Sequence, residues 1–68
     1  MNDDAFNMSM RKFLKSVGVT SQQKIEEAVR AAEQSGSLPA QLVVTVELRM
    51  PDIGLYHTVD GHITVDTP

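Results

Sequence analysis

The sequence contains no cysteine, which excludes disulfide bonds and thiolate metal sites. Its longest apolar run, from Leu42 to Val44, is far too short to span a bilayer. No basic, hydrophobic leader opens the chain, so we expect a protein of the cytoplasm rather than a secreted one. With 68 residues, we expect one domain, residues 1–68, without a deep catalytic cleft. Because such a small domain has no disulfide to stabilise it, we expect it to associate with a second copy.

The charge is negative overall but unevenly distributed. The formal net charge of −3 argues against a general nucleic-acid binder, since such proteins gain affinity by neutralising phosphates with Lys and Arg. Residues 1–24 hold four basic and two acidic residues, a net charge of +2. Residues 25–68 hold two basic and seven acidic residues, a net charge of −5. A chain with two regions of opposite charge can pair with itself.

The first half has the spacing of amphipathic helices. A first helix is predicted at about residues 4–17, where Asp3 or Asp4 can cap its start and Gly18 can end it. A second helix is predicted at about residues 21–35, with Thr20 or Ser21 as its cap and Gly36 after its end. The apolar residues that recur at helical spacing are Phe6, Met10, Phe13, Leu14 and Val17 in the first helix and Ile25, Ala28, Val29 and Ala32 in the second.

From Ala40 onward the apolar residues alternate with polar ones, as in strands with one buried face. Strands are predicted at about residues 40–50 and 55–66, joined by a loop at residues 51–54. This loop pairs Met50 with Leu55 and keeps the apolar residues of both strands on one face. A competing turn at Asp60 and Gly61 would mix the two faces and is rejected, so Gly61 is interpreted as a bulge or a close backbone approach.

The predicted fold class is therefore α+β, with two N-terminal helices followed by an antiparallel β-hairpin and one sheet face covered by helices. A lone two-stranded hairpin is marginal in water and leaves two unpaired edges. Edge pairing between two copies would complete a four-stranded sheet, which again favours a homodimer.

Three segments of the first half carry a family resemblance: Phe6 to Ser9, Arg11 to Lys15 and Val17 to Ser21. With these segments, the chain resembles a small family of uncharacterised bacterial proteins, closely over the first half and loosely over the second. The resemblance implies a bacterial cytoplasmic origin and a shared fold, but no activity and no site residues.

The candidate chemical groups are His57, Asp60 and His62. Because His57 and His62 lie five residues apart, they point to opposite faces of a strand and cannot bind one ion. His57 interrupts the apolar face opposite Leu48, where it is either a partly buried ring with its polar edge hydrogen-bonded or a pH-sensitive group at an interface. If two chains assembled an active site, Tyr56 would join these three as the residues to test first. No catalytic constellation is visible, so we expect neither an enzyme nor a cofactor or metal.

Arg11, Lys12 and Lys15 form a basic patch that is either a solvated helix face or a site for an acidic partner, a phosphate or RNA. Two helices joined at residues 18–20 also suggest a helix-turn-helix with residues 21–33 as the recognition helix, although three glutamates there oppose binding to phosphates. The leading hypothesis is a non-enzymatic protein-interaction module acting as a homodimer, with Arg11, Lys12, Lys15, Tyr56, His57 and His62 as possible interaction residues. The alternative is a small nucleic-acid-associated regulator that uses the basic first helix. No membrane partner is expected.

Overall fold

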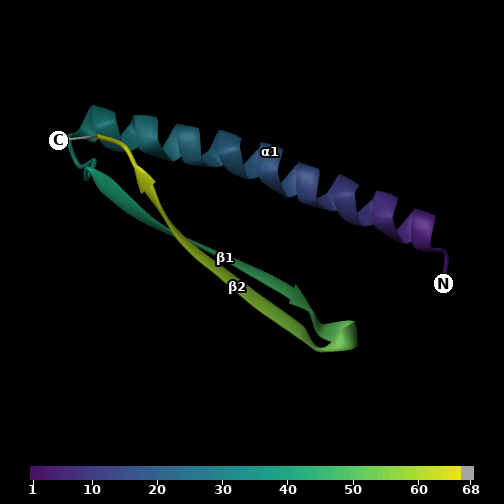
Figure 1. Cartoon of the computed structure of the whole chain (residues 1–68). Coiled ribbons are helices and arrows are strands. Elements are labelled where there is room, and N and C mark those ends of the chain that lie inside the picture. The colour runs from purple at the N-terminus through teal and green to yellow at the C-terminus, as the bar shows by residue number, and fades with distance from the viewer. Residues whose placement is uncertain (67–68) are drawn as a thin grey trace. The chain divides into compact units, whose positions relative to one another are not determined.

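The computed structural model describes residues 1–66, which form one helix and one β-hairpin (Figure 1). The helix α1 runs over Asp3–Ser35. Strand β1 (Gln41–Met50) is followed by a 3₁₀ turn η1 (Pro51–Ile53) and strand β2 (Leu55–Thr64). The chain divides into two compact units, one ending at Leu38 and the other beginning at Pro39.

The prediction of two N-terminal helices is wrong, because α1 continues without a break through residues 18–20 (Figure 1). Gly18 is helical rather than left-handed, and a glycine inside a helix costs only about 1 kcal/mol relative to alanine. The Thr20 hydroxyl donates a hydrogen bond to the Ser16 carbonyl at 2.7 Å, so it bonds back into the helix instead of capping a new one. The helix-turn-helix interpretation fails for the same reason, since residues 21–33 are not a separate helix.

Both ends of α1 carry clear capping signals. Asn2, rather than Asp3 or Asp4, is the N-cap, and its side-chain oxygen accepts a hydrogen bond from the Ala5 amide at 3.0 Å. The two aspartates lie in the first turn, where negative charge favours the positive end of the helix dipole. Gly36 ends the helix as predicted, with a left-handed φ of 73°.

The last carbonyls of α1 are satisfied in a Schellman motif. The Gly36 amide donates to the Glu33 carbonyl at 3.1 Å, and the Ser37 amide donates to the Ala32 carbonyl at 3.0 Å. The helix therefore stops at Ser35 for a local reason, and no packing partner is needed to end it.

The hairpin has the predicted register throughout. Met50 pairs with Leu55, Val46 with Val59 and Leu42 with Ile63, so the apolar residues of both strands share one face. The turn lies at η1, where Gly54 takes a φ of 70° and its amide donates to the Pro51 carbonyl at 3.2 Å. The reversal at Asp60 and Gly61 is therefore excluded by the pairing itself.

The interpretation of Gly61 as a bulge is wrong. Gly61 pairs with Val44 in the regular ladder, and its φ is not positive. A Cβ atom at this position would lie 3.7 Å from Val44 Cγ1, which is ordinary van der Waals contact. The hairpin thus contains a glycine where its own backbone does not require one.

None of the described residues is buried. The best-covered side chains of the hairpin, such as Leu42, Val44, Leu48 and Ile63, are only half-buried. Large apolar side chains on the same face stay accessible, including Val46 at 44% and Val59 at 52%. Neither the helical unit nor the hairpin unit, over the residues described, therefore contains by itself a closed hydrophobic core of the kind that stabilises a small domain. Within that range, no helix has a stretch long and apolar enough to cross a bilayer.

Candidate interaction surfaces

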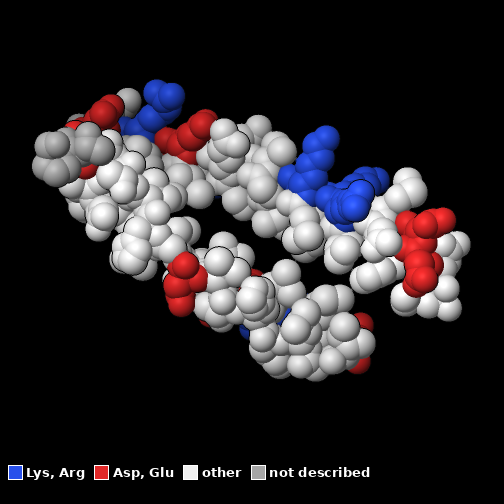
Figure 2. Space-filling view, viewed as in Figure 1, with Lys and Arg blue, Asp and Glu red and all other residues white. Residues whose placement is uncertain are grey.

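The basic patch, Arg11, Lys12 and Lys15, lies on the N-terminal half of α1, and all three side chains are exposed. From Ala5 to Thr20 the helix carries no acidic residue. Figure 2 shows basic side chains grouped together on this half of α1. Within residues 1–66 none of the three forms an ion pair, so the patch is a solvated cationic surface.

The same helix presents an apolar stripe. At 100° per residue, its members fall within a sector of about 120°, which is the width expected of a packing face. The α1 stripe consists of Phe6, Met10, Phe13, Leu14, Val17, Ser21, Ile25, Ala28 and Ala32. Its N-terminal members are highly accessible, with Phe13 at 59%, Leu14 at 49% and Phe6 at 47%. Exposed aromatic and aliphatic side chains grouped on one side of a helix are typical of a surface that binds another surface.

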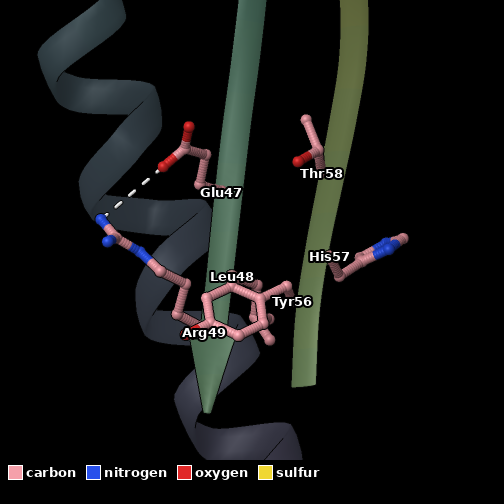
Figure 3. A pocket seen from close by; sticks show the side chains of 6 residues that line it. All are labelled: Glu47, Leu48, Arg49, Tyr56, His57 and Thr58. Atoms are coloured by element: carbon pink, nitrogen blue, oxygen red, sulfur yellow. Dashed lines mark ion pairs between the residues drawn. The ribbon is translucent and has the colours of Figure 1, made fainter. Parts of the chain in front are cut away.

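One shallow hollow lies on the hairpin near its turn (Figure 3). Its volume is about 230 Å³, and its lining residues are Glu47, Leu48, Arg49, Tyr56, His57 and Thr58. The Glu47 carboxylate and the Arg49 guanidinium form an ion pair at 3.6 Å on its rim. Both side chains are about two-thirds exposed, so this pair adds little stability. The hollow is smaller than pockets that bind small molecules, which are usually about 300–1,000 Å³.

The structure does not bring Tyr56, His57 and His62 together. Tyr56 lies opposite Arg49 and extends toward it across the hairpin, whereas His57 points away from β1 (Figure 3). His57 is exposed, so the partly buried ring expected from the sequence is not present. His62 pairs with Val43, several residues from the hollow. These three residues therefore do not form one site in a single chain.

Among residues 1–66, no three histidine or carboxylate side chains gather closely enough to hold a metal ion. Asp60 instead accepts a hydrogen bond from the Thr45 hydroxyl at 3.0 Å.

Sequence reasoning did not select Glu47 and Arg49 as site residues. Their signal was visible, however, because opposite charges two residues apart on one strand share a face.

Comparison with known proteins places the chain in a family. A family model described as a family of unknown function (DUF6494) matches residues 1–66. No curated protein and no solved structure matches the chain. The predicted membership of a family of unknown function is confirmed, whereas the bacterial origin stays a prediction. Since the match covers nearly all of the sequence, the chain belongs to this family of unknown function, DUF6494.

Proposed function

We propose that this protein is a small non-enzymatic interaction module of the bacterial cytoplasm that works as a homodimer. The observation that supports the proposal is that neither compact unit, taken by itself, contains a buried side chain among the described residues. A folded chain of this size needs apolar burial to offset the conformational entropy lost on folding. A second copy can supply that burial, because each copy carries an apolar helix stripe and an apolar hairpin face.

The proposed module binds partners through surfaces rather than through a pocket. The solvated basic patch on α1 suits an acidic protein surface. The polar face of the hairpin, where Tyr56 and His62 lie, offers a second contact area next to the Glu47–Arg49 pair. His57, on the other face, is accessible to a second copy packed on the apolar residues.

The test of the homodimer is the mass in solution at several protein concentrations, measured by sedimentation equilibrium. We expect a dimer that dissociates on dilution and a midpoint of thermal unfolding that rises with protein concentration. A chain that stays monomeric and folded at every concentration would contradict the proposal, because its stability would then come from a single copy.

The second candidate function is a small nucleic-acid-associated regulator that uses the N-terminal half of α1. The observation that favours it is the run from Ala5 to Thr20, which holds three basic residues and no acidic residue. Titration with labelled RNA and DNA at rising salt separates the two functions. Binding to phosphates weakens steeply with salt, whereas a packed apolar interface does not. The net charge of −3 makes the interaction module the better-supported choice.

A further inference from the structure

We infer that the homodimer forms through the α1 stripe, with the helix of a second copy packed antiparallel to the first. This inference rests on the proposed homodimer and assigns its surface and orientation. The two helices would cross near the middle of α1, between Val17 and Ser21. The continuity of α1 is essential, since two separate helices would not present one stripe from Phe6 to Ala32.

The first argument is the taper of the stripe. Its N-terminal half carries the large side chains Phe6, Met10 and Phe13, whereas its C-terminal half ends in the small residues Ala28 and Ala32. An antiparallel copy sets Phe6 opposite Ala32 and Met10 opposite Ala28, so a large side chain meets a small one at both ends. Interiors pack densely when large and small residues alternate across a contact.

A parallel copy would not fill space in this way. It would place Phe6 beside Phe6 at one end of the pair and Ala32 beside Ala32 at the other. The helix axes would be forced apart at the phenylalanines, and a gap would open at the alanines. Gaps in an apolar contact forfeit dispersion energy, so the taper favours the antiparallel direction.

The second argument is charge. Residues 5–20 of α1 carry three basic residues and no acidic one, whereas residues 21–35 carry three glutamates with Lys24 and Arg30. Most of these charged side chains lie on the side of α1 away from the stripe, so they do not meet across the contact. The antiparallel direction keeps the two basic segments at opposite ends of the pair and aligns the two helix dipoles favourably. A parallel pair would place the two basic halves side by side.

Only Lys24 places a charge within the stripe between Phe6 and Ala32. Its amine forms an ion pair with the Glu27 carboxylate at 3.5 Å, and its side chain is 81% exposed. Glu27 lies one turn further along, outside the stripe. A lysine can cover apolar surface with its methylene stem while its amine stays in water, so Lys24 is compatible with the contact.

The exposed area of the stripe indicates how strong the contact is. Phe6, Met10, Phe13 and Leu14 are each between 41% and 59% accessible. Together these four side chains expose on the order of 400 Å² of surface per chain. An antiparallel pair that covered them in both copies would bury about 800 Å² in total. This total lies below the ~1,200 Å² of standard specific interfaces, so we expect a pair that dissociates on dilution.

Cysteine cross-linking tests the orientation, and the chain has no native cysteine to interfere. Met10→Cys and Ala28→Cys are prepared separately, mixed and oxidised, so that any disulfide must join two chains. We expect the mixture to cross-link and neither variant to do so alone, because in the antiparallel pair two copies of residue 10 lie about 27 Å apart. A mixture of Lys12→Cys and Glu26→Cys is expected to stay unlinked, because these two residues lie level with each other in the antiparallel pair but on the side of each helix away from the contact.

The outcomes separate this inference from the proposed function. Cross-linking of Met10→Cys with itself would overturn the antiparallel direction. A dimer by mass that gives no disulfide in the mixture would overturn the α1 interface and leave the homodimer intact. A monomer at every concentration would overturn both.

A matched pair of substitutions measures the strength of the contact without cysteine. Phe13→Ser removes a stripe residue that is 59% exposed, whereas Val19→Ser removes an exposed apolar side chain on the opposite side of α1. We expect Phe13→Ser to raise the dissociation constant of the dimer at least tenfold and Val19→Ser to change it less than twofold. Equal effects would overturn the assignment of the stripe, provided that circular dichroism shows the same helix content in both variants.

Discussion

Thr45 and Asp60 lie directly opposite each other in the hairpin, and the Thr45 hydroxyl donates a hydrogen bond to the Asp60 carboxylate at 3.0 Å. This bond joins β1 to β2 on the polar face, at a distance of 15 residues along the chain. It depends on the register, since a slip by one residue would send the two side chains to different faces.

We expect Thr45→Val to lower the free energy of unfolding by about 0.5–1 kcal/mol, because it keeps the β-branched shape and removes an exposed charge-assisted hydrogen bond. Thr58→Val is the control, since Thr58 lies on the same face and its hydroxyl makes no hydrogen bond within residues 1–66. Urea denaturation of both variants measures the difference. Equal stability losses would show that the bond contributes nothing in solution.

The two faces of the hairpin predict losses of stability of different size when a charge is introduced. Val46→Asp places a carboxylate on the apolar face opposite Val59, and we expect it to cost about 2 kcal/mol or more. Val43→Asp makes the same change on the polar face, where Val43 is 77% exposed, and we expect a cost below about 1 kcal/mol. Thermal unfolding at one protein concentration compares them, and similar midpoints would contradict the assignment of the faces.

The two glycines of the helical unit predict effects of opposite sign. Gly18 has helical geometry and open space around an added Cβ, so Gly18→Ala should stabilise the protein by about 0.5–1 kcal/mol. Gly36 has a left-handed φ of 73°, so Gly36→Ala should destabilise it by about 1 kcal/mol. Urea denaturation of both variants gives the two values. A loss of stability in Gly18→Ala would mean that α1 breaks at this residue in solution.

Gly61 offers a test of the hairpin surface. Because an added Cβ would make only ordinary contact with Val44, Gly61→Ala should raise the free energy of unfolding by about 0.5 kcal/mol. Unfolding is followed by circular dichroism at low and high protein concentration. A variant less stable than the unmodified protein, with a larger loss at high protein concentration, would contradict this expectation. It would indicate that the backbone of a second copy lies close to Gly61 in the dimer.

Much of the second half of the fold was predictable from the sequence. The alternation from Leu42 to Met50 and the loop at residues 51–54 determined the pairing of both strands, because only one register keeps the apolar residues together. The end of α1 at Gly36 was predictable as well. The signals there are local, and nothing distant competes with them.

The continuity of α1 and the grouping of the site residues were decided only by the folded structure. Gly18 with Thr20 two residues later resembles a helix stop and a new cap, but the cost of a glycine in a helix, about 1 kcal/mol, is small beside the hydrogen bonds of an uninterrupted helix. The hollow on the hairpin depends on how Arg49 and Tyr56 extend from neighbouring strands, which alternation alone does not specify. The sequence by itself determined the strand register and the apolar faces. Only the folded structure decided that residues 18–20 stay helical, because the backbone hydrogen bonds of a continuous helix outweigh the cost of one glycine and leave no mark in the spacing of the apolar residues.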